Sequence, residues 1–193
     1  WTHLCRLLTL ARALAPKGWA EVSVEALCAH ADGLLCLLRH GWRAEDARVL
    51  LGAFEGRLGV AWSRQHSSLD RSRGRCAEAC AEALGVPMVA TNDVVFHDPD
   101  RQPLADVLTC VRRRVSLEEA GHALHLNGER YLLEEGEFRA RYGGRPEAIR
   151  TAMEWARRCT FSLQRLRYRY PREVVPSGYT AMGWLTLQVQ EGL

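Results

Sequence analysis

The chain has 193 residues, of which 47% are hydrophobic and 25% charged, a composition typical of a globular protein that can bury a core. Its net charge of +3 is too small to indicate nucleic-acid binding by itself. No apolar run approaches the roughly 18 residues that a membrane-spanning helix requires, so we expect no membrane segment.

Seven cysteines are present, an odd number without a repeated spacing. Cys5, Cys28, Cys36, Cys110 and Cys159 lie in apolar stretches typical of helices or strands. Reduced cysteines in the core of a cytoplasmic protein explain this pattern better than a disulfide framework does. We therefore expect free thiols and a cytoplasmic location.

Helical and extended patterns alternate through the first hundred residues. Leucines at helical spacing predict a helix over residues 2–15, and Ser23 is placed to cap a second helix. Three apolar runs short enough for buried strands then alternate with two helical patterns, the second of which ends at Gly85. The expected strands are 33–38, 58–63 and 86–93, and the helices between them are 44–57 and 68–85.

This alternation with short connections predicts right-handed βαβ units, a parallel sheet and thus an α/β fold. Parallel sheets bind their ligands at the carboxyl ends of the strands. Asn92 and Asp93 directly follow the third apolar run, so their side chains are expected at that edge.

The second half of the chain is predicted to be helical. Helical patterns cover 103–114, 116–124 and 143–159, and a final helix is expected from Thr180 after a loop with Pro and Gly. The local signals are a capping box from Ser116 to Glu119, Pro146 near a helix start, and an apolar face through Ile149, Met153 and Trp155 or Ala156.

The change in character predicts a domain boundary near residue 100, between a first domain over 1–100 and a helical segment over 101–193. The sequence begins at Trp1 within an amphipathic pattern and ends with helical character. We therefore expect the chain to be a piece of a longer protein.

The stretch LGVPMVATNDVVFHDPDRQPLADVLTCVR, residues 84–112, resembles the bacterial C-family DNA polymerases of the polymerase III α-subunit type. It is similar to the end of their polymerase-and-histidinol-phosphatase (PHP) domain and to the region after that domain. Further matches occur in the same order and spacing, in LCRLLTLA, LCAHADGLLCLL, ERYLLEEGEF and PEAIRTAMEWARRCTFSL. The stretch from Leu166 to Thr180 resembles the error-prone branch more than the replicative one.

The resemblance implies that residues 1–100 form the C-terminal part of a PHP-type (TIM-like) β/α barrel, and that 101–193 form an α-helical connector leading into the polymerase palm. It implies an error-prone DNA-directed DNA polymerase that acts in replication, repair and damage-induced mutagenesis. The catalytic aspartates and their Mg²⁺ would lie outside this segment, which would act as a scaffold. Implied partners are DNA, deoxynucleoside triphosphates, accessory mutagenesis proteins and a sliding clamp.

Asp93 is the first candidate metal ligand. Relatives with an intact PHP metal site have Asp-x-His here, whereas this chain has Val95 at the His position, and the turn at Asp98-Pro99 makes replacement by His97 unfavourable. His40 falls where some relatives have a metal-binding Cys. The alternatives are that Asp93 caps a turn and that His40 is a solvated loop residue. We expect the PHP metal to be lost.

The candidate DNA-binding residues are Arg165, Arg167 and Arg169, which alternate with Tyr168 and Tyr170. Arginine can bind phosphate and aromatic rings can stack on bases. The alternative is a solvated surface.

Two pairs could bridge a metal by helical spacing, Cys76 with Cys80 and His122 with His125. Neither has the further ligands that a zinc site needs. Packing is the better explanation for the cysteines, and a solvated helix face for the histidines.

Two other functions remain open. One is a PHP-type metal-dependent phosphoesterase or proofreading 3′–5′ exonuclease, which requires several His and Asp ligands. The other is a degenerate, non-catalytic binding module. Metal content and the coding sequence beyond Leu193 distinguish these from a polymerase.

Overall fold

The computed structural model describes residues 1–13, 15–39, 41–167 and 174–192. The chain divides into two compact units, Trp1–Thr160 and Phe161–Leu193. His40 and Arg169 lie outside the described residues, and so do Tyr168 and Tyr170.

The first unit contains a three-stranded sheet in the order β1-β2-β3, with all strands parallel. The strands are β1 (Cys36–Leu38), β2 (Leu58–Trp62) and β3 (Met88–Ala90). Cys36 pairs with Leu58, and Val60 pairs with Met88. The parallel sheet and the mixed α/β character predicted from the alternating pattern are confirmed.

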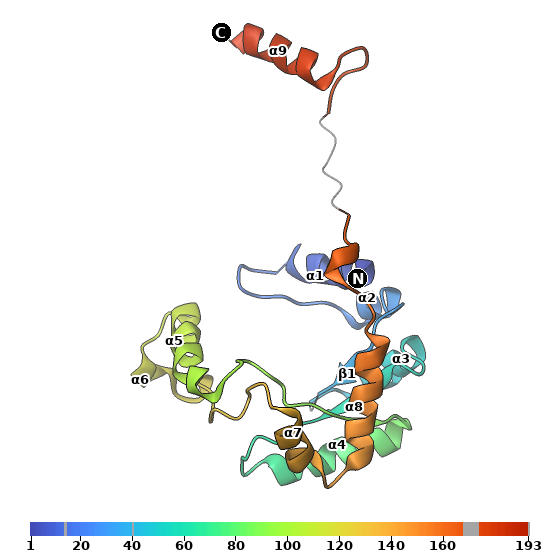
Figure 1. The fold of residues 1–193 in the computed structure, drawn as a ribbon, viewed down its shortest axis with the longest axis vertical. Helices are drawn as coiled ribbons and strands as arrows, with labels where there is room; N and C mark the ends of the chain where they lie inside the picture. Colours follow the sequence, from blue (N-terminus) through green and yellow to red (C-terminus); the bar gives the residue numbers. More distant parts are fainter. Residues whose placement is uncertain (14, 40, 168–173, 193) are drawn as a thin grey trace. The chain divides into compact units, whose positions relative to one another are not determined.

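Helices precede, separate and follow these strands (Figure 1). They are α1 (Thr2–Ala13), α2 (Val24–Ala29), α3 (Ala44–Ala53), α4 (Asp70–Leu84), α5 (Gln102–Arg113), α6 (Leu117–Ala120), α7 (Glu135–Tyr142) and α8 (Pro146–Arg158), with the 3-10 turns η1 (Pro99–Arg101) and η2 (Gly121–Ala123).

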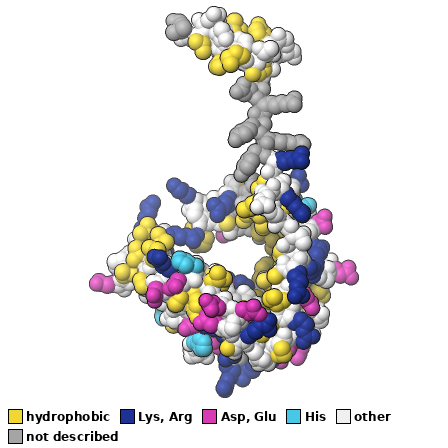
Figure 2. All heavy atoms as spheres, viewed as in Figure 1, with side chains coloured by type: hydrophobic (Ala, Val, Ile, Leu, Met, Phe, Trp, Pro, Cys, Tyr) yellow, Lys and Arg dark blue, Asp and Glu magenta, His cyan; other side chains and the backbone are white. Residues whose placement is uncertain are grey.

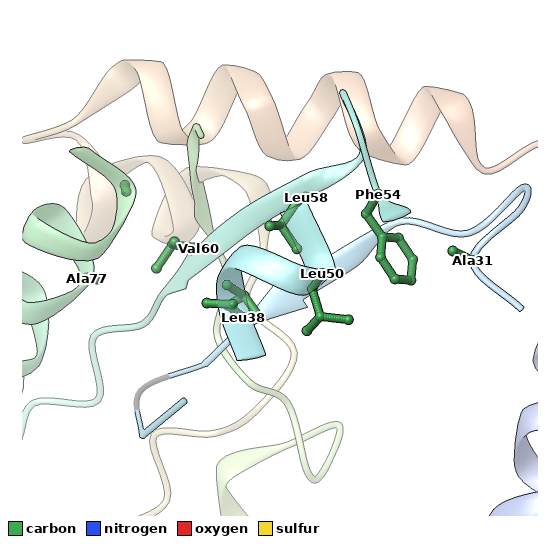
Figure 3. Close-up of a cluster of buried hydrophobic side chains, with 9 residues drawn as sticks. Ala31, Leu38, Leu50, Phe54, Leu58, Val60 and Ala77 are labelled. Carbon is green, nitrogen blue, oxygen red and sulfur yellow. The ribbon is translucent and has the colours of Figure 1, made fainter. Parts of the chain in front are cut away.

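One face of the sheet packs against α3 and α4. Leu38, Leu58 and Val60 on the strands contact Leu50 of α3 and Ala77 of α4, all of them buried (Figure 3). Leu58 and Val60 of β2 thus point to the same layer, because strand residues two apart share a face. This cluster is the larger of the two cores.

The other face of the sheet is covered by α8, which packs closely on β3. Gly59 faces this side, and a Cβ atom there would lie 2.9 Å from Val89 Cγ2 and 3.0 Å from Trp155 Cη2. A second core cluster joins Trp62 and Ala90 to residues of α7 and α8, including Tyr142. The sheet is therefore enclosed by helices on both faces.

Several local signals act as predicted. Ser23 accepts a hydrogen bond from the Ala26 amide, Ser116 and Glu119 form a complete capping box, and Gly85 ends α4 in the left-handed conformation with φ 64°. Pro146 occupies the first turn of α8. These helix boundaries thus coincide with short-range capping signals in the sequence.

Other predictions differ from the structure. The strand expected over 33–38 is shorter and not fully buried, because β1 is an edge strand and Leu37 is 42% exposed. Met153 was placed on the apolar face of α8 but is 46% exposed, whereas Trp155 is buried. Helix α7 was not predicted, since its sequence has no strong apolar periodicity; it begins at a capping box formed by Glu134 and Glu137.

The second unit contains the 3-10 turn η3 (Leu163–Arg165) and the helix α9 (Ala181–Gly192). The Thr180 hydroxyl accepts a hydrogen bond from the Gly183 amide, and Tyr179 packs edge-on against Trp184. The predicted helix start near Thr180 is confirmed.

All seven cysteines are free, and Cys110 is buried while Cys76 and Cys159 are exposed. Within the described ranges, no helix combines the length and the apolar character needed to cross a membrane. The domain boundary expected near residue 100 stays a prediction.

Candidate functional site at the carboxyl edge of the sheet

Asp93 lies three residues beyond β3, at the edge where all three strands end. It has a left-handed backbone with φ 49°, which Asp tolerates better than most residues do. Its Oδ2 atom accepts hydrogen bonds from two guanidinium groups, Arg39 at 2.6 Å and Arg130 at 2.8 Å. The carboxylate, with a side chain 22% exposed, is thus occupied by two cationic donors.

The two arginines come from distant parts of the chain. Arg39 directly follows β1, and Arg130 belongs to the segment 127–131, which lies beside the end of β3. Arg130 also donates from Nε to the backbone oxygen of Asp93 at 2.9 Å. In return, the Val95 amide donates to the Arg130 carbonyl at 2.8 Å. Asp93 therefore ties the segment 127–131 to the sheet.

Asn92 is the one polar residue among the buried residues of the described chain. Its Nδ2 atom donates to the carbonyl oxygens of Glu129, at 2.8 Å, and Tyr131, at 2.7 Å. Its Oδ1 atom accepts from the Tyr142 hydroxyl at 3.2 Å and from Arg141 at 3.3 Å. This amide is consequently satisfied on both sides, as a buried polar group must be.

The fully buried Tyr142 links α7 to the ends of two strands. Its hydroxyl lies 2.9 Å from the Thr91 carbonyl and 3.2 Å from Asn92 Oδ1, so its single proton is shared between these two acceptors. The hydroxyl oxygen accepts from the Arg64 amide at 3.1 Å. Burial raises the pKa of the Tyr142 phenol, and the Arg64 hydrogen bond opposes this. The phenol therefore stays neutral and acts as a structural hydrogen-bonding group.

A salt bridge completes the polar network. Arg141, whose side chain is only 9% exposed, donates to Glu129 Oε2 at 2.7 Å and lies over the Tyr131 ring at 5.7 Å. His66 Nε2 lies 3.9 Å from the same carboxylate oxygen. The acidic and basic groups of this edge are thus paired with one another.

A cavity of about 120 Å³ opens at this edge and is lined by the ends of all three strands. Its polar groups include the Arg39 guanidinium, the hydroxyls of Ser63 and Thr91, and the Asp93 carboxylate. Within the described ranges, no group of three or more His, Cys, Asp or Glu side chains could bind a metal ion. Among the described residues, the polar groups of this cavity are therefore one guanidinium, two hydroxyls and one carboxylate.

The other predicted site residues are scattered. Val95 and His97 are exposed beyond β3. The partners of the Asp93 carboxylate are the two arginines, Arg39 and Arg130. Arg165 and Arg167 are exposed in the second unit. His40 and Arg169 lie outside the described residues, so their roles stay predictions.

Cys76 and Cys80 line a second cavity at this end of the sheet, together with Arg39 and Ser63. Cys76 is exposed and Cys80 half-buried on α4, and burial raises the pKa of the Cys80 thiol, with a smaller contribution from Cys76. His122 is exposed, while His125 packs edge-on against Phe96 with ring centroids 5.8 Å apart.

Sequence reasoning placed Asn92 and Asp93 at the strand end but missed their partners. Arg39 is 54 positions from Asp93 in the sequence, and Arg130 is 37 positions away. No short-range pattern marks such a pairing, because it depends on how the 127–131 segment returns to the sheet.

No family model matches the chain. Individual relatives do match it. Error-prone DNA polymerase 1 of Agrobacterium fabrum is 36% identical over 196 residues, which covers 99% of this chain and 18% of that protein. The error-prone DNA polymerase of Caulobacter vibrioides is 35% identical over 95% of the chain, and that of Mesorhizobium japonicum is 36% identical over all of it.

The chain is therefore related, along nearly its whole length, to a segment of DNA polymerases. More particularly, the relatives are error-prone DNA polymerases, which confirms the resemblance seen in the sequence. The chain spans about 18% of the length of these relatives.

Proposed function

We propose that the chain is a segment of an error-prone DNA-directed DNA polymerase of the cytoplasm, which serves replication, repair and synthesis past damaged templates. The identity of about 35% over nearly the whole chain carries this proposal. The substrates of the whole protein are DNA and deoxynucleoside triphosphates, its cofactor is Mg²⁺ bound outside this segment, and its partners include accessory mutagenesis proteins and a sliding clamp.

Within that protein, residues 1–100 are the C-terminal part of a PHP-type barrel, and residues 101–193 are the connector to the polymerase palm. The segment is a scaffold that has lost the PHP metal. The two guanidinium groups on Asp93 support this role, because they give the carboxylate cationic partners from the protein itself. Arg165, Arg167 and Arg169 are proposed to contact the DNA backbone.

Primer extension tests the polymerase proposal. The protein encoded by the complete reading frame, supplied with Mg²⁺ and a damaged template, is expected to extend a primer, whereas the 193-residue chain alone is expected to be inactive. Replacing Arg165 and Arg167 with Ala in the long protein should weaken template binding and leave its unfolding temperature unchanged. A reading frame whose product has no extension activity would refute the proposal.

A nuclease assay separates the scaffold from the phosphoesterase or exonuclease alternative. We expect the long protein to contain no stoichiometric Zn²⁺ or Mn²⁺ at Asp93 and to release no nucleotides from a 3′-labelled primer through this site. If Asp93→Asn abolishes such a release without affecting extension, the site is catalytic and the scaffold assignment is wrong.

A further inference from the structure

A second groove lies within the first unit, between the turn at residues 16–19 and the C-terminal end of α5. It has a volume of about 720 Å³. Its lining includes Lys17, Trp19, Arg112, Arg113 and Glu119. None of these residues contributes to the network around Asp93.

The turn presents an exposed aromatic ring on a fixed backbone. The Trp19 amide donates to the Pro16 carbonyl at 2.9 Å, and Gly18 takes a left-handed conformation with φ 93°. Arg112 donates from Nη2 to the Gly18 carbonyl at 2.5 Å, which fastens the turn to α5. The Trp19 residue is nevertheless 67% exposed. Because its backbone is already held, a ligand that stacks on the indole has to order only the side-chain torsions of Trp19.

The groove has an excess of positive charge. Lys17, the only lysine of the chain, and Arg113 are exposed, and Arg112 adds a third cation. The opposing acid is Glu119, whose pKa is lowered because the backbone amide and the hydroxyl of Ser116 donate to it. Its carboxylate is thus committed to the capping box. Figure 2 shows Lys and Arg side chains next to the hydrophobic side chains over α5.

We propose that this groove binds single-stranded nucleic acid, with a base stacked on Trp19 and the phosphates next to it contacting Lys17 and Arg113. An exposed indole among cations suits this ligand, since each base offers an aromatic face and each phosphate a negative charge. A duplex hides its base faces, so it cannot use the indole in the same way. The inference does not depend on polymerase activity and goes beyond the scaffold role.

Fluorescence anisotropy of a labelled oligothymidylate with the full chain tests the inference. Trp19→Ala is expected to weaken binding roughly 5- to 100-fold, the effect of losing one stacked base. Trp19→Phe keeps an aromatic face and should retain most of the affinity. The slope of log Kd plotted against the logarithm of the salt concentration reports the number of phosphate contacts. Lys17→Ala and Arg113→Ala should each reduce this slope by about 0.7, as expected for one lost phosphate contact.

Arg75→Ala is the matched control, because Arg75 is an exposed arginine on α4 that lines a different basic groove. It should leave the affinity unchanged, and circular dichroism should show that every variant melts like the parent chain. Three results with the isolated chain would overturn the inference: no binding at low salt, equal loss of affinity in Trp19→Ala and Arg75→Ala, or a matching duplex that binds as tightly as the single strand. If Trp19→Ala weakens binding by the isolated chain but not by the long protein, another part of that protein covers the groove, and the proposal fails for the native molecule.

Discussion

Asp93→Asn is the sharpest test of how the carboxyl edge of the sheet is stabilised. Asn has nearly the same shape as Asp, tolerates the left-handed φ of 49°, and keeps a neutral acceptor oxygen for the arginines. The backbone bond from Arg130 to the carbonyl of residue 93 also remains. The substitution therefore removes the negative charge and little else.

The expected loss follows from the two ion pairs. Arg130 is 24% exposed and donates at 2.8 Å, so its charge-assisted bond contributes about 1.5 kcal/mol to the free energy of unfolding. Arg39 donates at 2.6 Å but is 56% exposed, so solvent screening limits its contribution to about 0.5 kcal/mol. Because Asn keeps a neutral hydrogen bond to each arginine, only part of this total of about 2 kcal/mol is lost. We expect Asp93→Asn to destabilise the first unit by about 1 kcal/mol, which lowers its unfolding temperature by about 2–4 °C.

Thermal unfolding followed by circular dichroism measures this loss. Glu45→Gln is the control, because Glu45 forms a fully surface-exposed pair with Arg43 at 3.1 Å and should cost less than about 0.5 kcal/mol. High salt should reduce the difference in unfolding temperature between the parent chain and Asp93→Asn only slightly, since salt screens a partly buried ion pair weakly.

An unchanged or raised unfolding temperature in Asp93→Asn would refute this reasoning, because it would mean that the two arginines do not stabilise the carboxylate. A rise in stability of the parent chain with added Zn²⁺ or Mn²⁺ that disappears in Asp93→Asn would refute it as well. In that case a metal ion, rather than arginine, would be the natural partner of the carboxylate.

Substitutions at three further residues, Tyr142, Gly59 and Gly52, test how packing stabilises the first unit. Tyr142→Phe should cost about 1–2 kcal/mol at neutral pH because a buried hydroxyl network is broken, as urea unfolding would show. Burial raises the pKa of the Tyr142 phenol above its ordinary value of about 10. The stability that the neutral phenol contributes is therefore present below about pH 10 and is lost as the pH rises above it. Between about pH 9 and 11, the parent chain should thus lose more stability than Tyr142→Phe does. Gly59→Ala should destabilise by about 1–3 kcal/mol, since its Cβ would meet Val89 at 2.9 Å. Gly52→Ala, in the last turn of α3 with nothing within 4 Å of its Cβ, should stabilise by less than about 1 kcal/mol in the same assay.

The parts of the fold that the sequence predicts well are those with short-range causes. Ser23, Ser116, Gly85 and Pro146 mark helix ends through hydrogen bonds or backbone angles within a few residues. The parallel sheet follows from the alternation of apolar runs with helical patterns. These features need no knowledge of the tertiary structure.

The parts that it predicts poorly depend on distant contacts. Leu37 belongs to an apolar run but is half-exposed, because nothing in the local sequence tells which strand lies at the sheet edge. Helix α7 escapes prediction since its stabilising residue, Tyr142, packs against strand ends that lie fifty residues earlier. The arginine partners of Asp93 escape for the same reason.

The pairing of Asp93 gives this carboxylate a structural role that requires no metal ion. An ion bound to Oδ2 would lie within about 5 Å of the Arg39 and Arg130 donors, at which distance like charges repel by several kcal/mol near a protein surface. Metal and arginines therefore exclude each other at this oxygen. Arg130 also fixes the 127–131 segment through the backbone of residue 93, so it anchors this segment to the sheet edge. A carboxylate without its imidazole neighbour can thus remain at the sheet edge as a structural ion-pair centre.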